Sequence, residues 1–207
     1  MDEQLRQKCI DITQDRIDGL YNDLKAYIYI RKNRLQHKDD NIGGGNFVIA
    51  LSLFSALGFL GKVYYCVEHP DRFNRSGFAL NERETFIEFM KFLNEGAIVL
   101  GLPAEEDVLG LVWNGFRNNL AHRLIVEPGK SLITFYFETI QDGSIAKILA
   151  NAKTHIAFSH DGSYRNWTVN CDALLAQLPA ITAEVTEFIQ SHQDFNLNIL
   201  RKVINFE

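Results

Sequence analysis

The sequence predicts a mainly helical protein, a bundle of four to five helices with a small antiparallel β-sheet inserted before the last long helix. Apolar residues recur at steps of three and four over most of the chain, which is the spacing of an amphipathic helix. The period changes after Pro128-Gly129, where β-branched and aromatic residues gather as they do in strands. Strands and helices do not alternate regularly, so a doubly wound nucleotide-binding sheet is not expected.

Length and composition fit a single domain spanning residues 1–207, with the β insertion at about 123–170. The chain is 46% apolar and 23% charged, which excludes a disordered polypeptide. Its three cysteines lie far apart and include no C-x2-C pair, so neither a disulfide framework nor a structural zinc site is expected. The net charge of −5 argues against a broad, nonspecific nucleic-acid binder, and any contact with nucleic acid has to be local.

Two helices are predicted at the start of the chain. The first runs from about Asp2 to Gln36 and ends in the polar turn His37 to Gly45. The second runs from Asn46, as N-cap, to Cys66. Its stretch Phe47 to Gly61 carries no charge, but these 15 residues fall short of the roughly 20 that span a bilayer, which favours a central buried helix. Small residues stand there at strict steps of three, a pattern that lets a neighbouring helix approach closely: Ser52, Ser55, Gly58 and Gly61.

Two more helices are predicted before the sheet. Asn81 is expected to cap the third helix, with Glu84 at the third position as in a capping box. The fourth is expected from about Ala104 to His122, with acidic residues in its first turn, where the helix dipole favours negative charge. The expected inward faces are Phe86, Phe89, Met90 and Leu93 in the third helix, and Val108, Leu111, Val112, Phe116 and Leu120 in the fourth.

The predicted sheet begins with a strand from Leu132 to Glu138, which is rich in β-branched and aromatic residues. Two further strands, Thr154 to Ser159 and Tyr164 to Val169, flank the turn His160 to Ser163. This turn carries Asp-Gly at its tip, which is typical of a β-hairpin.

The last long helix is predicted from about Ala173 to His192, capped by Asn170 or Asp172 and carrying Pro179 inside it. The tail from Asp194 to Glu207 is expected to form a short extra helix or a docked end. The expected inward face of the long helix is Leu174, Leu178, Ile181, Val185 and Phe188.

One segment carries candidate catalytic residues, at the end of the fourth predicted helix. It contains Arg117, directly followed by Asn118, and then His122 after four intervening residues. This pattern resembles the active-site motif of the HEPN superfamily, in which Arg and a polar residue precede His by a similar spacing. The resemblance implies an all-helical domain, a dimer and, in many members, a metal-independent endoribonuclease with Arg117, Asn118 and His122 as its catalytic residues.

These residue types suit the cleavage of RNA without a metal. His has a pKa near neutrality and serves as a base or acid for the 2′-hydroxyl. The planar guanidinium of Arg matches two phosphate oxygens and stays charged. A reaction that consumes the 2′-hydroxyl leaves a 2′,3′-cyclic phosphate and spares DNA.

The spacing of the motif sets a geometric condition. Residues five apart on an ideal α-helix differ by about 140° in direction, so Arg117 and His122 do not share a face. Three solutions remain: the Arg117 side chain reaches round the helix, the helix distorts near Gly115, or the site is composite. The resemblance favours a homodimer in which two Arg–His sets line one groove.

The resemblance places the protein in the cytoplasm, in growth arrest or phage defence, with RNA, such as a tRNA loop, as substrate and an antitoxin protein as a possible partner. No cofactor and no metal are implied, and no membrane is expected. One alternative is a non-catalytic helical module that binds a protein or a nucleotide. Another is a membrane-associated effector that uses Asn46 to Gly61.

Spacing alone does not identify the motif, because Arg31 and His37 also match it with five residues between them. Arg31 is followed by Lys32 at the frayed end of a helix, whereas Arg117 lies late in an apolar helix. One HEPN subgroup has a tyrosine two residues after the His, which a partner nucleotidyltransferase modifies; here that position is Leu124, so this regulation is not expected.

Several other residues of chemically active types are expected to be structural. Cys66 and His69 have no second pair of ligands, so a metal site is not predicted. Adjacent strand residues point to opposite faces, which excludes a catalytic triad at Ser159, His160 and Asp161. Core or interface packing is expected for Trp113 and Trp167. Solvated surface is expected for Arg72, Arg75 and Arg83, and for Glu82, Glu84 and Glu88.

Overall fold

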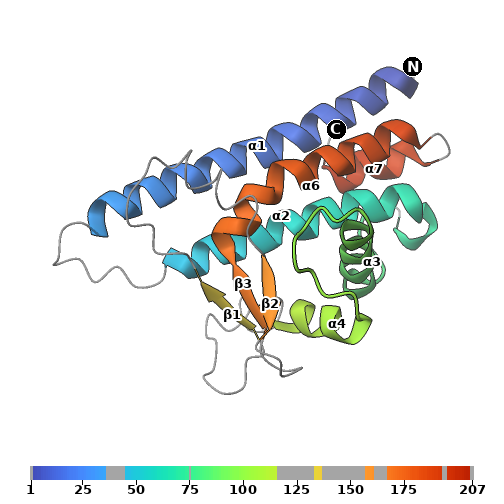
Figure 1. Cartoon of the computed structure of the whole chain (residues 1–207). Coiled ribbons are helices and arrows are strands. Elements are labelled where there is room, and N and C mark those ends of the chain that lie inside the picture. The colour runs from blue at the N-terminus through green and yellow to red at the C-terminus, as the bar shows by residue number, and fades with distance from the viewer. Residues whose placement is uncertain are drawn as a thin grey trace.

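The computed structural model describes residues 2–35, 45–74, 76–115, 133–136, 157–160, 167–192 and 195–205. Within them the chain is mainly helical with one small sheet, as predicted (Figure 1). The helices are α1 (Asp2–Leu35), α2 (Gly45–Glu68), the 3-10 turn η1 (Pro70–Arg72), α3 (Glu82–Glu95), α4 (Glu106–Asn114), α6 (Cys171–Ser191) and α7 (Leu197–Val203). The strands are β1 (Ile133–Tyr136), β2 (Phe158–His160) and β3 (Trp167–Asn170).

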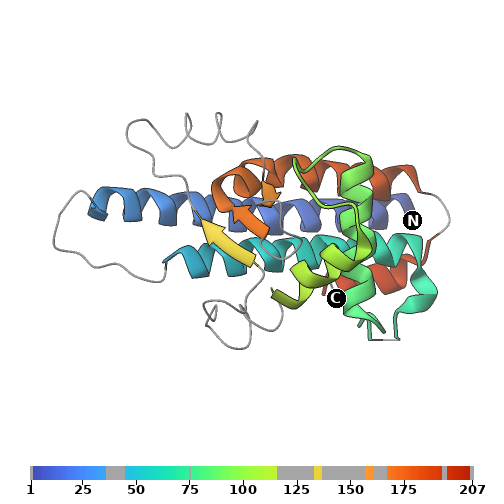
Figure 2. The same ribbon diagram turned by 60° about the horizontal axis from the view of Figure 1, so that its bottom comes forward.

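The bundle is built on three long helices, α1, α2 and α6, which run side by side (Figures 1 and 2). The expectation of a central buried helix is confirmed for α2, which packs against α1, α3, α6, α7 and β1. Its fully buried side chains include Leu53, Phe54, Leu57 and Leu60. The predicted cap at Asn46 is wrong, because the helix begins at Gly45 and already includes Asn46.

The length of α2 also differs from the prediction. The helix continues to Glu68, and the 21 residues from Val48 to Glu68, with a mean hydropathy of 1.6, are long and apolar enough to cross a membrane. The segment expected from the sequence is too short to span a membrane. The observed length of α2 removes that argument. Burial within the protein accounts for the apolar composition, since 56% of this stretch is buried inside the bundle.

Among the small residues of α2, Gly61 makes a close contact with a neighbouring helix. A Cβ added at Gly61 would lie 3.1 Å from Cδ1 of Phe89 in α3, so this glycine lets the Phe89 ring rest on the α2 backbone. At Gly58 an added Cβ would meet nothing within 4 Å. Ser55 is exposed and donates a hydrogen bond to the carbonyl of Leu51 in its own helix. The small residues spaced three apart in α2 therefore do not form one continuous surface against a neighbouring helix.

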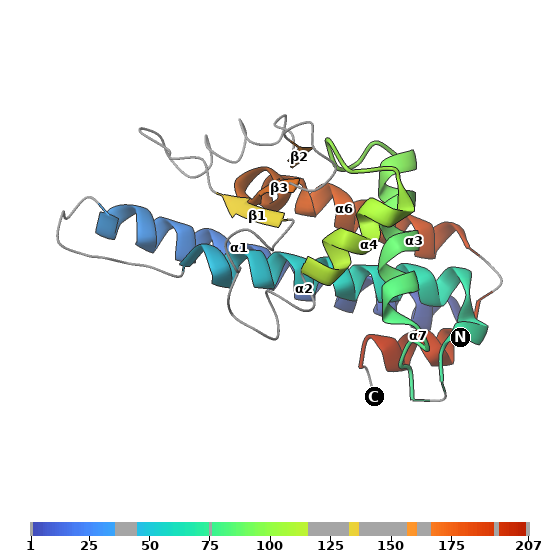
Figure 3. The same cartoon turned by 90° about the horizontal axis from the view of Figure 1, so that it is seen from below.

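Helices α3 and α4 lie across the long helices (Figures 2 and 3). The cap at Asn81 is confirmed, because its side chain accepts a hydrogen bond from the backbone N–H of Glu84 at 3.2 Å. Glu84 in turn accepts from the side-chain amide of Asn81 at 3.2 Å, a variant of the capping box. The predicted inward face of α3 is buried in full, at Phe86, Phe89, Met90 and Leu93.

The sheet lies within the predicted insertion, and its strand order is β1-β3-β2. Strands β2 and β3 pair antiparallel, as expected, with Phe158 opposite Val169 and His160 opposite Trp167. His160 therefore belongs to the strand and not to the turn, because the register follows the buried pair Phe158 and Val169. The tip of the hairpin lies outside the described residues.

The first strand departs from the predicted antiparallel sheet. Strand β1 pairs with β3 in parallel, with Ile133 opposite Trp167 and Tyr136 opposite Asn170. A two-residue hairpin permits only the antiparallel direction, whereas a long connection permits either. The twenty residues between Tyr136 and Ala157 are such a connection, so composition could not set the direction of β1.

The sequence predicted either Asn170 or Asp172 as the cap of the last long helix, and the cap is Asn170. Asn170 ends β3 and caps α6, its side-chain oxygen accepting from the N–H groups of Asp172 and Ala173 at 3.1 Å each. The extra helix expected in the tail is α7, capped by Asn196. The predicted inward residues Leu174, Leu178, Ile181 and Val185 are fully buried.

The connection that leads into α4 is fixed by backbone hydrogen bonds. The carbonyl of Leu100 accepts from the N–H groups of Ala157 and Phe158, at 2.8 and 3.2 Å. The N–H of Leu100 donates to the side-chain oxygen of Gln177 in α6 at 3.2 Å. The sheet and α6 thus set the place from which α4 starts.

We predict that the two glycines of α2 respond differently to alanine. Gly58→Ala raises the free energy of unfolding by about 0.5–1 kcal/mol, because alanine is the better helix former and the space is open. Gly61→Ala forfeits this gain, because its Cβ crowds Phe89. Urea denaturation of both variants measures the difference, and equal stabilities would contradict the assigned contact.

Candidate functional site

Helix α4 leads into the predicted motif and is anchored by its apolar face. Val108, Leu109 and Val112 are buried, while Leu111 is only half-buried. Glu106 and Asp107 stand in the first turn, as expected from the helix dipole. Glu105, which was also expected in the first turn, is instead the N-cap residue, and its side chain makes no capping hydrogen bond.

The described part of the chain leaves α4 at Gly115. This residue keeps helical backbone angles and shares its N–H between the carbonyls of Leu111 and Val112. The expected distortion near Gly115 concerns the turn that follows, which lies outside the described residues.

The predicted catalytic residues Arg117, Asn118 and His122 lie outside the described residues, which break off after Gly115. The same holds for Leu124 and for His37, the histidine of the second matching pair. The structure thus gives helix α4, which precedes the motif in the sequence, and the elements around that helix.

Three side chains of α3 contact α4 along its length. The ring of Phe86 packs against that of Trp113, with 5.3 Å between the ring centroids. At the other end of α4, Lys91 donates to Glu106 at 3.0 Å. Between them, the guanidinium of Arg83 lies against Gly110. Trp113 therefore serves as a packing anchor, as predicted from the sequence.

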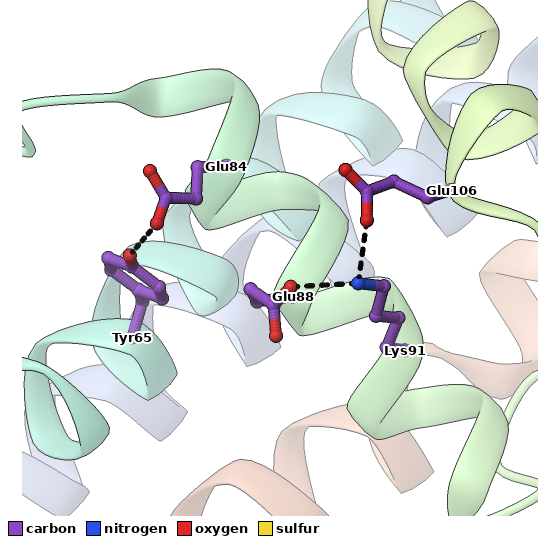
Figure 4. A network of polar contacts seen from close by, with 5 residues as sticks. All are labelled: Tyr65, Glu84, Glu88, Lys91 and Glu106. Carbon is purple, nitrogen blue, oxygen red and sulfur yellow. Dashed lines mark hydrogen bonds and ion pairs between the residues drawn. The ribbon is translucent and has the colours of Figure 1, made fainter.

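The acidic side chains of α3 form a network with defined partners (Figure 4). Glu84 accepts a hydrogen bond from the Tyr65 hydroxyl of α2 at 2.9 Å. Lys91 donates to Glu88 at 2.9 Å and to Glu106 of α4 at 3.0 Å, which links the two helices. Glu82 pairs with Lys62 of α2 at 2.9 Å. These carboxylates lie on a partly exposed face, as expected, and each of them also has a basic or hydroxyl partner.

This network was not visible in the sequence because its partners are distant in the chain. Tyr65 and Glu84 are nineteen residues apart, and they meet only because α2 and α3 cross. Burial, together with the hydrogen bond to Glu84, raises the pKa of Tyr65 to about 12. The hydrogen bonds from Lys91 to Glu88 and Glu106 raise the pKa of Lys91. The network joins α2, α3 and α4, and it favours the protonated forms of its two donors, the Tyr65 hydroxyl and the Lys91 ammonium.

The other polar groups considered as ligands or catalysts do not assemble into a site in the described part. Among those residues no three His, Cys, Asp or Glu side chains come close enough to hold a metal ion. The three cysteines are free and buried, and burial raises the pKa of the Cys66 thiol to about 12. Ser159 and His160 are successive residues of β2, and Asp161 lies outside the described residues.

A histidine that sequence reasoning missed lies between α2 and α6. Nε2 of His192 stands 3.4 Å from a carboxylate oxygen of Glu68, and its ring packs on Phe188 with 4.0 Å between ring centroids. His192 ends α6, and its backbone N–H donates to the carbonyl of Phe188. The contact joins two helix ends, so its role is structural.

The clustered arginines are placed only in part. Arg72 is exposed, with its Nε 3.9 Å from Asp71, and Arg75 lies outside the described residues. Arg83 is exposed as well, but its guanidinium rests on α4.

Compared with known proteins, the chain matches no family model, no curated protein sequence and no solved structure. The resemblance to the HEPN superfamily accordingly rests on the residues of the motif in the sequence alone.

We predict that the raised pKa of Tyr65 makes stability depend on pH in the alkaline range. The folded protein keeps this proton up to about pH 12, whereas an ordinary tyrosine loses it near pH 10. The associated stability is complete below pH 10 and is lost as the pH rises through about 12. An ultraviolet absorbance titration should show one fewer high-pH tyrosine in Tyr65→Phe, and one tyrosine shifted to lower pH in Glu84→Gln. An unchanged titration in either variant would contradict the assignment.

Proposed function

We propose that the chain is a metal-independent endoribonuclease of the HEPN type, with Arg117, Asn118 and His122 at its reacting centre. The observation that carries the proposal is the Arg-Asn…His motif, which directly follows the apolar helix α4 in the sequence. Of the second matching pair, Arg31 lies in α1, and His37 lies outside the described residues.

The spacing of the motif states what geometry the proposal needs. Arg117 and His122 are five apart, a spacing that an undistorted α-helix would place on different faces. The proposal therefore requires a helix that distorts near Gly115, an Arg117 side chain that reaches round the helix, or a site composed of two protomers.

The reaction then follows from the two groups. His122 accepts the proton of the ribose 2′-hydroxyl, and the 2′-oxygen forms a bond to the adjacent phosphorus. The bond from phosphorus to the 5′-oxygen breaks, and this oxygen takes up a proton, leaving a 2′,3′-cyclic phosphate and a 5′-hydroxyl. Arg117 binds the phosphate oxygens, whose negative charge grows in the transition state, and Asn118 orients His122 or a phosphate oxygen.

The setting we infer is a cytoplasmic toxin or phage-defence nuclease. The net charge of −5 argues for a defined substrate such as a tRNA loop over indiscriminate RNA. A homodimer would place two Arg–His sets along one groove, and an antitoxin protein would hold the activity in check.

We predict that purified wild-type protein cleaves cellular RNA in excess EDTA. His122→Ala should lower the cleavage rate by about 10²–10⁴-fold, the usual contribution of general acid–base catalysis. Mapping of the new ends should show 2′,3′-cyclic phosphates and 5′-hydroxyls, and DNA of the same sequence should remain intact.

The second matching pair of the chain offers the control. His37→Ala and Arg31→Ala remove an Arg–His pair of similar spacing and should leave cleavage unchanged. Equal cleavage by wild type and His122→Ala would refute the assignment of His122. Absence of cleavage with every RNA fraction tested would favour the alternative, a non-catalytic module that binds a protein or a nucleotide.

We predict that the active site is shared between two protomers. Arg117→Ala and His122→Ala proteins should each be inactive alone, and mixing them should restore part of the activity, because a heterodimer then holds one complete set. Sedimentation velocity checks that both variants remain dimers. Dimers that exchange subunits without regaining activity would show that each site lies within one protomer.

A further inference from the structure

The connection between η1 and α3 is a short two-armed loop whose two faces differ. Its arms pair at an isolated bridge between Phe73 and Ala79, and the N–H of Leu80 donates to the carbonyl of Arg72 at 2.9 Å. Phe73 is buried, with 6.1 Å between the centroids of its ring and that of Tyr65, and Ala79 packs against the core. The inner face of the loop is therefore part of the core.

The opposite face of the same loop carries apolar side chains that stay in water. Successive residues of an extended arm point to opposite faces, so Phe78 and Leu80 share the face opposite Ala79. Their exposed fractions are 65% and 67%, the largest among the large apolar residues of the described chain. Arg72 lies across from Leu80 on the other arm and is exposed as well. We call these three residues, Phe78, Leu80 and Arg72, the outer face.

Hydrogen bonds and a glycine fix the backbone that presents the outer face. The side-chain oxygen of Asn74 accepts from the N–H groups of Ser76 and Phe78, at 2.9 and 3.0 Å. Gly77 has a φ of +80°, which favours glycine, and a Cβ there would stand 2.8 Å from the backbone of Lys202 in α7. The loop thus rests on α7 at the edge of the molecule (Figure 3), and binding through it orders little additional backbone.

The charged residues next to the outer face are mainly basic. Arg72 stands 3.9 Å from the carboxylate of Asp71, which is itself exposed. Arg201 and Lys202 stand in the last turn of α7, the helix on which the loop rests. The acid that follows the loop, Glu82, is engaged in an ion pair with α2. Apolar side chains beside an excess of cations match a surface with negative charge at its border and apolar material beneath.

We propose that the outer face docks on an anionic lipid surface, with Phe78 and Leu80 inserted among the headgroups and Arg72 at the lipid phosphates. Binding to a membrane interface grows with buried apolar area and with the attraction between basic residues and anionic lipids. A fluid bilayer accepts protruding side chains without a preformed pocket. The contact is peripheral, so it leaves α2 in the bundle, and it does not depend on the proposed nuclease function.

Co-sedimentation with vesicles tests this contact on the full chain. Vesicles of equimolar phosphatidylcholine and phosphatidylserine should bind the protein, and pure phosphatidylcholine vesicles should bind it about fivefold more weakly. Phe78→Ser and Leu80→Ser should each weaken binding to the anionic vesicles by about tenfold, and Arg72→Gln by about fivefold. Val48→Ser removes an exposed apolar side chain of α2 instead, so it is the matched control and should leave binding unchanged. Because all four side chains are exposed, circular dichroism should show the same fold in every variant.

Fluorescence tests whether the loop itself enters the lipid. In Phe78→Trp the added indole should shift its emission to the blue on contact with the anionic vesicles, and brominated lipid should quench it. Added salt should weaken binding, because it screens the attraction between the cations and the lipid phosphates. An unshifted emission in a protein that sediments with the vesicles would overturn the assignment to this loop.

Two other results would overturn a lipid surface as the occupant. A folded protein that binds neither kind of vesicle would leave the outer face to a protein partner. A dimer in sedimentation velocity that Phe78→Ser dissociates would assign the outer face to a second copy of the chain.

Discussion

The burial of α2 is the constraint on which the rest of the structure depends. This helix is apolar over most of its 24 residues and cannot remain in water, so α1, α3, α6, α7 and β1 all pack against it. Each fully buried leucine or phenylalanine contributes about 1.5–3 kcal/mol relative to exposure, and α2 supplies several, including Leu53, Phe54, Leu57 and Leu60. The positions of α3 and, through it, of α4 follow from this packing.

Features written in local residue patterns were predictable from the sequence. The helical period located all the long helices, and the caps at Asn81 and Asn170 follow from side chains that accept hydrogen bonds from nearby N–H groups. The parallel direction of β1 and the inclusion of His160 in β2 were not predictable, because both depend on which strand lies beside which. The start of α2 at Gly45 was not predicted, because glycine in a sequence usually indicates a loop.

The candidate site was predictable to the extent that it is a chemical pattern. Residue types pointed to Arg117, Asn118 and His122 as candidates, and the angle between residues five apart on a helix set a geometric condition, but these residues lie outside the described part of the chain. The surroundings of α4 could not be predicted, because they are contacts between helices. One example is the guanidinium of Arg83 in α3, which lies against Gly110 of α4.

The pairing of the first helix with the penultimate one has a consequence for synthesis of the protein. Arg6 and Glu3 of α1 bond with Gln190 at the end of α6, and the two helices pack along their length. On the ribosome, α1 and the apolar α2 emerge long before α6 exists to cover them. The nascent chain therefore exposes its most aggregation-prone surface until almost all residues have been translated, which makes it a natural client of chaperones.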